Sequence, residues 1–145
     1  MKKIFLSSAI FLFCFLPLTG QTREAVYSAE ISVHTQDSIL SYCFLHHVSD
    51  VQVEGQGVVV KVLPDDNSGS RHQRFILKLS SGQTLLIAHN IDIAPRIGSL
   101  RTGNKVKFYG EYAWNEQGGV VHWTHHDPDG GHEAGFLECR GKRYQ

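Results

Sequence analysis

Hydrophobic and polar residues alternate along much of this chain, and a period of two is the pattern of a half-buried β-strand. In the clearest example, Phe75, Leu77 and Leu79 would share one face of a strand. Groups of glycine, proline, serine, asparagine and aspartate separate the alternating stretches, as expected for turns. The pattern predicts five strands, at residues 53–63, 73–79, 83–89, 105–113 and 120–126.

A different period precedes these strands. Apolar residues recur at three- and four-residue spacing from Ile39 to His47, with Asp37 or Ser38 available as the N-cap. This spacing predicts one N-terminal helix of about three turns. Residues 21–35 are polar and aperiodic, so they are expected to form a flexible lead.

The order of these elements favours one fold class. The connection at residues 91–104, between the third and fourth strands, is longer than the others. Five curved strands with a long connector after the third are typical of the oligonucleotide/oligosaccharide-binding (OB) barrel. We therefore expect a mostly β domain at residues 36–145, built as a small five-stranded antiparallel barrel that resembles the OB-fold. Gly55 and Gly57 are expected where the first strand bends. Another small antiparallel barrel or sandwich is the alternative.

The first twenty residues have the composition of a signal peptide. Lys2 and Lys3 precede an apolar run at residues 4–16, and Pro17 ends that run. The run is shorter than the roughly 20 apolar residues that span a bilayer. We expect cleavage near Gly20, export to the periplasm or outside the cell, and no membrane span in the mature chain.

Charge argues against one class of partner. Removing Lys2 and Lys3 from the 14 basic residues leaves 12, against 14 acidic residues, so the mature chain has a net charge of −2 with neutral histidines. A domain that grips duplex phosphates is usually basic, so duplex nucleic acid is not expected as a partner. We expect a monomer whose nine histidines make its charge sensitive to pH between about 5 and 7.

Two cysteines remain in the mature chain, Cys43 and Cys139. In an exported protein such a pair suggests a disulfide, which here would tie the helix to the C-terminal tail. Two separate buried thiols are the alternative.

Four of the nine histidines lie in the fifteen residues from Gly118 to His132. The Asp-Pro-Asp-Gly-Gly sequence at 127–131 predicts a tight turn that returns the chain toward the last strand. Imidazoles and a carboxylate are ligands for zinc or a similar divalent metal. The candidate metal ligands are His125, His126, Asp127 and His132. A hydrogen-bonded polar patch without an ion is the alternative.

A second set of polar residues lies at the ends of predicted strands. His72 and Arg74 would point from one strand face, and such a pair can hold a phosphate or carboxylate. A salt bridge at the barrel mouth is the alternative for Arg74, and a turn role is the alternative for Asn90. The candidate ligand-binding residues are His72, Arg74, His89, Asn90, Asp92 and His122.

Known catalytic motifs give little support for an enzyme. The chain has no Gly-x-Ser-x-Gly elbow, no phosphate-cradling P-loop and no His-Glu-x-x-His. His122-Trp123-Thr124 matches one half of a paired His-x-Thr phosphoesterase motif, but the second copy is absent. Histidines could still act as general acid and base beside Arg74. Exposed aromatic side chains, with Tyr109, Tyr112, Trp114 and Trp123 as candidates, could stack on a single-stranded oligomer.

Four segments together resemble one family. They are His72-Gln73-Arg74-Phe75, Ala88-His89-Asn90-Ile91-Asp92, Phe108-Tyr109-Gly110-Glu111-Tyr112 and His122-Trp123-Thr124-His125-His126-Asp127-Pro128. They are similar to the small exported bacterial proteins grouped as domain of unknown function 3465. The resemblance implies a single exported domain and no particular activity.

Three functions remain open from the sequence. The first is a binding domain whose histidine, arginine and aspartate patch holds a small anionic ligand or a divalent metal. The second is a metal-dependent or histidine-based hydrolase that acts on phosphodiesters. The third is an interaction module of the cell envelope.

Overall fold

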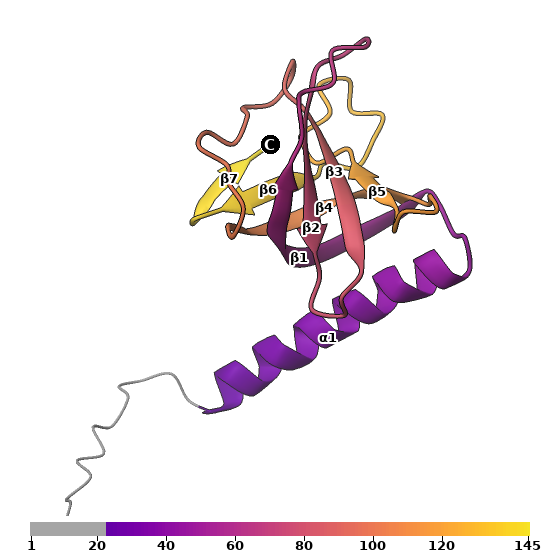
Figure 1. Ribbon diagram of the computed structural model, residues 1–145, viewed down its shortest axis with the longest axis vertical. Coiled ribbons are helices and arrows are strands. Elements are labelled where there is room, and N and C mark those ends of the chain that lie inside the picture. The colour runs from indigo at the N-terminus through magenta and orange to yellow at the C-terminus, as the bar shows by residue number, and fades with distance from the viewer. Residues whose placement is uncertain (1–22) are drawn as a thin grey trace, which may run out of the picture.

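The computed structural model describes residues 23–145, in which a long helix is followed by seven strands (Figure 1). The elements are α1 (Arg23–Leu45), β1 (Val51–Val62), β2 (His72–Lys78), β3 (Thr84–Asn90), β4 (Lys105–Ala113), β5 (Val120–His122), β6 (Phe136–Cys139) and β7 (Lys142–Tyr144). The predicted signal peptide lies outside the described residues. Within residues 23–145, no helix combines the length and the hydropathy of a membrane span.

Five strands close into a barrel in the order β1-β2-β3-β5-β4, and β4 pairs again with β1. The predicted OB-like barrel with one N-terminal helix is therefore confirmed. Its strands are not all antiparallel, however, because β3 and β5 run parallel. The chain crosses the barrel as β4 and returns as β5 between β3 and β4, so β5 runs in the direction of β3.

Strand β1 belongs to both sides of the barrel. Its first part, Val51–Val58, pairs with β4, and its last part pairs with β2. The register shifts between Val59 and Lys61, a bulge that lets the strand bend. Gly55 lies before this bulge, and a Cβ built there would be 2.5 Å from the Phe108 ring. The predicted glycine thus permits close packing, while the bulge itself falls after both glycines.

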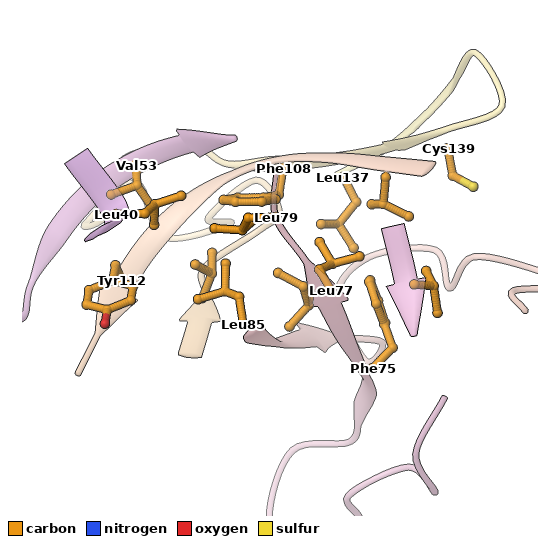
Figure 2. Packing of buried hydrophobic residues seen from close by; sticks show 14 of the residues in the cluster. Leu40, Val53, Phe75, Leu77, Leu79, Leu85, Phe108, Tyr112, Leu137 and Cys139 are labelled. Carbon is orange, nitrogen blue, oxygen red and sulfur yellow. The ribbon is translucent and has the colours of Figure 1, made fainter. Parts of the chain in front are cut away.

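The barrel interior is filled by the inward side chains of every strand that closes it (Figure 2). Phe75, Leu77 and Leu79 are all buried, so the predicted inward face of β2 is confirmed. The largest buried side chains from the other strands include Leu85, Ile87, Phe108 and Tyr112.

Helix α1 is longer than predicted and begins at Arg23, so most of the expected flexible lead is helical. Two alanines and two glutamates in this stretch favour helix even without an apolar period. The hydroxyls of Thr35 and Ser38 donate to carbonyls four residues earlier, so these polar residues are satisfied within the helix. Among its described side chains, Leu40 and Cys43 in the C-terminal half belong to the core.

The C-terminal hairpin of β6 and β7 was not predicted. Strand β6 adds to β4 beyond the barrel, with Cys139 opposite Val106. Arg140 and Gly141 both have positive φ, which suits a tight two-residue hairpin turn. Strand β5 also ends earlier than predicted, at His122, because Trp123 has a φ of 53° and breaks the alternation.

The predicted disulfide is wrong, since Cys43 and Cys139 are both free and buried. Cys43 lies near Tyr112, and Cys139 pairs with Val106, six residues back along β4. Six strand residues span about 20 Å. A disulfide requires Cα atoms within about 7 Å. The alternative of two separate thiols is correct.

Candidate functional site

The carboxylate of Glu111 is the centre of a cluster on the outer face of β4 and β5. Glu111 lies opposite His122 in the antiparallel register of these strands. The His122 Nε2 is 3.4 Å from Glu111 Oε1, and the His132 Nε2 is 2.8 Å from Glu111 Oε2. Two imidazoles, from positions ten residues apart, thus share one carboxylate.

The loop after β5 places His132 against Glu111, and Asp127 holds that loop. The Asp127 carboxylate accepts hydrogen bonds from the backbone N–H groups of Asp129 (3.1 Å), Gly131 (2.7 Å) and His132 (2.8 Å). These bonds lower the pKa of Asp127, and the bond from the Asp129 N–H has the largest effect. The aspartate is therefore a loop-forming residue that stays ionised.

Trp123 forms a wall of the cluster. Its ring stacks on the imidazole of His132, with centroids 4.3 Å apart and planes inclined by 7°. The left-handed φ of Trp123 turns its side chain away from the strand alternation and toward this loop. A second contact holds the same loop nearby: the Tyr109 hydroxyl donates a hydrogen bond to the Glu133 carboxylate. Tyr109 and Glu111, two residues apart on β4, together anchor the loop on the barrel wall.

The two histidines at Glu111 have opposite electrostatic character. The hydrogen bond that His132 donates to the Glu111 carboxylate raises the pKa of His132, and the Nδ1 of the same ring lies 2.9 Å from the Glu133 carbonyl oxygen. Both ring nitrogens of His132 face oxygen acceptors, so this ring is favoured as the imidazolium. Burial lowers the pKa of His122, although Glu111 opposes that shift. The cluster therefore favours protonation of His132 and opposes protonation of His122.

His89 is a core histidine. It is fully buried, its Nδ1 lies 2.9 Å from the Thr124 hydroxyl, and its Nε2 lies 3.1 Å from the Pro95 carbonyl oxygen. The carbonyl requires N–H on Nε2, so Nδ1 accepts from Thr124. Burial lowers the pKa of His89 to about 4, and it is neutral at physiological pH. Its two bonds join β3 to the loops on either side.

The predicted ligands at the barrel mouth are largely engaged with neighbouring loops. The Arg74 guanidinium donates twice to the Pro64 carbonyl, at 3.2 Å, and lies 3.8 Å from Asp66. Asp92 pairs with Arg71 at 2.6 Å. The Asn90 side chain accepts the N–H of Asp92, as in a turn. The alternative of a mouth salt bridge is thus observed for Arg74, whereas Asn90 makes a turn-like bond without the positive φ expected of a turn residue.

Arg74 nevertheless remains on the same outer surface as His122. It lies opposite Ala88 on β3, and β3 pairs with β5 through Leu86–Val120 and Ile87–Val121, so Ala88 and His122 are the next residues on these two parallel strands. Side chains of Arg74 and His122 are about one third exposed, and alanine between them is small. His72 lies two residues from Arg74 on β2. Burial is the largest cause of the lowered pKa of His122, and the charge of His72 is a smaller cause in the same direction. We call His72, Arg74, Ala88 and His122 the outer row.

Comparison with known families gives one match. The sequence model described as "Protein of unknown function (DUF3465)" matches residues 24–145. The chain belongs to the DUF3465 family. No curated protein matches the chain in sequence.

In this DUF3465 protein the four candidate metal ligands do not form one set. His125 is buried with its Nδ1 near the His126 carbonyl, His126 is exposed, Asp127 holds backbone N–H groups, and His132 contacts Glu111. Within residues 23–145, no group of three or more histidine, cysteine, aspartate or glutamate side chains has the arrangement to hold a metal ion.

The candidate aromatic platforms of this DUF3465 protein are mostly used within the fold. Tyr112 is buried, and the Trp114 indole N–H donates to the Phe44 carbonyl at 3.0 Å. Tyr109 bonds Glu133, and Trp123 stacks on His132. A stacked single strand of bases therefore gains little from these side chains.

Sequence reasoning missed Glu111, which the structure places at the centre of the cluster. The alternation of residues 105–113 already turned Glu111 outward, and pairing this strand with the last one would have set it opposite His122. The convergence of His122 and His132 could not be found in the same way. It depends on the path of the loop between them.

Proposed function

We propose that this DUF3465 protein is an exported, monomeric binding domain that holds a small ligand with a phosphate or carboxylate group on the outer row. The observation that carries the proposal is the register of β2, β3 and β5, in which Arg74 is opposite Ala88 and both Ala88 and His122 directly follow the paired residues Ile87 and Val121. The outer face of strands 2 and 3 is also the face with which OB-folds bind their ligands.

The donors of the outer row suit an anion. Within residues 23–145, the hydrogen bonds of Arg74 come from Nε and Nη2, while its Nη1 lies 3.8 Å from Asp66, beyond hydrogen-bond distance. His72 donates from Nδ1 to the Ser70 carbonyl at 2.7 Å, so its Nε2 can donate to an anion in the imidazolium form of the ring. His122 is neutral at pH 7 and becomes a second cation as the pH falls. Glu111 and His132 compensate each other's charge at the edge of this surface.

A half-buried apolar row adjoins these donors. Ile76 lies opposite Leu86 on β3, and Leu86 lies beside Val120 on β5. All three point outward and are partly exposed. The surface therefore favours an anionic group attached to an apolar body over a free inorganic ion.

Phenyl phosphate and inorganic phosphate are suitable probes, followed by amide chemical shifts in NMR. We expect saturable shifts at the outer row, with phenyl phosphate binding more tightly. Arg74→Gln should weaken binding by about tenfold or more, since a hydrogen bond to a charged group contributes about 1.5–3 kcal/mol. Arg143→Gln is the matched control, because Arg143 has a similarly long carboxylate contact of 3.9 Å on β7.

The proposal predicts a specific pH dependence. Binding should strengthen as the pH falls below about 6.5, because His122 gains a proton only below its ordinary pKa. Shifts scattered over the surface, or equal affinities of the Arg74→Gln and Arg143→Gln variants, would contradict the proposal.

The second candidate is a histidine-based hydrolase. It is favoured by one observation, the opposite pKa directions of His122 and His132 around Glu111, which is how environments separate a general base from a general acid. Hydrolysis of bis(4-nitrophenyl) phosphate tests it. Activity that Glu111→Gln and His122→Gln both abolish, with an unchanged fold by circular dichroism, would favour this candidate over the binding domain.

A further inference from the structure

A row of two exposed valines, Val58 and Val60, lies on the outer face of β1. These side chains are 38 and 41% exposed. They lie on a strand that pairs on both sides, where outward positions of a barrel are normally polar. Because exposed apolar surface that clusters on one face marks a contact site, this row requires a partner of its own.

Lysines flank the row on both sides. Lys78 on β2 and Lys105 on β4 are the two cross-strand neighbours of Val58. None of the ion pairs within residues 23–145 includes either lysine. Val58 thus lies between two lysines that form no ion pair with the described residues.

Helix α1 converts this face into a cleft. The helix passes along the barrel at the end that carries β1 and the turn between β2 and β3 (Figure 1). The cleft has a volume of about 400 Å³, and its lining includes Val33 of α1 with Val58, Val60, Leu79, Lys78 and Lys105. A second cleft of about 510 Å³ shares Val33 and continues along α1 to Ala25. Small-molecule sites typically measure about 300–1,000 Å³.

We propose that this cleft binds a single-chain aliphatic carboxylate, with the chain between α1 and the valines of β1 and the headgroup between Lys78 and Lys105. The apolar lining matches the chain, and the two ammonium groups select an anionic headgroup over a neutral or cationic one. None of the described side chains that line the cleft is aromatic, so stacked bases or sugars find no platform among them. A second copy of the chain, packed on this face by a two-fold axis, would bring lysines against lysines.

This site is separate from the outer row. Lys78 and His72 are the two ends of β2, six residues apart, which corresponds to about 20 Å. Binding at one site therefore does not depend on binding at the other, and an experiment that contradicts one proposal leaves the other unaffected.

Calorimetric titration of the full chain with dodecanoate, below its micellar concentration, tests the proposal. We expect one site per chain, no saturable binding of acetate and at least tenfold weaker binding of dodecylammonium. Replacing both lysines, Lys78→Gln with Lys105→Gln, should weaken dodecanoate at least tenfold. Lys142→Gln, on β7, is the matched control and should bind as the parent does. NMR shifts should map to Val33, Val58 and Val60.

Several results would overturn the proposal. They are equal affinities for dodecanoate and dodecylammonium, an unchanged affinity in the double lysine variant, and shifts that map to another surface. Association only with vesicles of anionic phospholipid, without binding of monomeric dodecanoate, would also overturn it. Such a result would assign the face to a membrane surface.

Discussion

His89 shows how a single titratable side chain can serve the fold rather than a ligand. Its imidazole is fully buried and bonded on both nitrogens, to Thr124 and to the Pro95 carbonyl. Protonation would place an N–H against the Thr124 hydroxyl and a charge in the barrel wall, which is why burial lowers the pKa to about 4. The residue therefore links the stability of the protein to pH.

We predict an acid-sensitive stability that depends on His89. A histidine with a lowered folded pKa contributes stability above its unfolded pKa of about 6.5, and that contribution is lost as the pH falls toward 4. The loss by pH 4 should be roughly 3 kcal/mol. Urea unfolding at pH 7, 5.5 and 4 measures it, with His89→Gln expected to show a flatter profile. An NMR titration of the parent in which His89 gains a proton near pH 6.5 would contradict this.

Glu111 should set the pKa of His132. Because Glu111 raises the folded pKa of His132, their contact stabilises the protein below about pH 6.5, and the contribution is lost as the pH rises through the folded pKa. Glu111→Gln should lower the His132 pKa and destabilise the protein more at pH 6 than at pH 9. NMR titration of the imidazole and urea unfolding at both pH values measure the effect. Glu138→Gln on β6 is the control and should leave His132 unchanged.

At the scale of elements, β1 is the strand with the strictest local requirements. It bends enough to pair with β4 and then with β2, and its glycine at position 55 lets the Phe108 ring pack directly on the backbone. Both features arise from neighbours that are distant in sequence. The strand's own pattern indicated a bend but placed it too early.

Substitution of Gly55 by alanine should be destabilising. The added Cβ would lie 2.5 Å from Phe108 Cζ in a fully packed interior, so the ring must shift. Overpacking of this kind typically costs about 1–3 kcal/mol. Gly98→Ala is the matched control, since a Cβ there meets no atom within 4 Å, and it should be neutral within about 0.5 kcal/mol. Thermal unfolding of both variants makes the comparison, and equal Tm values would argue against this packing.

At the scale of the whole molecule, closure of the barrel decides which distant residues meet. Closure sets α1 against the end of the barrel where Cys43 approaches Tyr112, while β6 carries Cys139 to the other end of β4. Closure also brings two connections together at the mouth of the barrel. Arg96 of the β3–β4 connection donates a hydrogen bond to Asp65 of the β1–β2 connection at 2.9 Å. Loop positions, rather than strand positions, therefore depend most on the complete fold.

The free thiols give a prediction at this scale. Cys43 and Cys139 are both buried, and burial raises the pKa of Cys43, so neither should react quickly with iodoacetamide in the native state. After unfolding without reductant, peptide mass mapping should find both residues alkylated. A disulfide-linked peptide pair containing Cys43 and Cys139 would contradict the structure.

The sequence by itself determined the barrel strands, their inward faces and the OB-like order, because period-two alternation and turn residues act locally. It also identified His122 and His132 as residues of interest. Only the tertiary structure decided that they meet at Glu111, that Asp127 holds a loop and that Arg74 bonds Pro64. These contacts join side chains through loop paths and strand register, and neither is encoded in the spacing of residues along a single element.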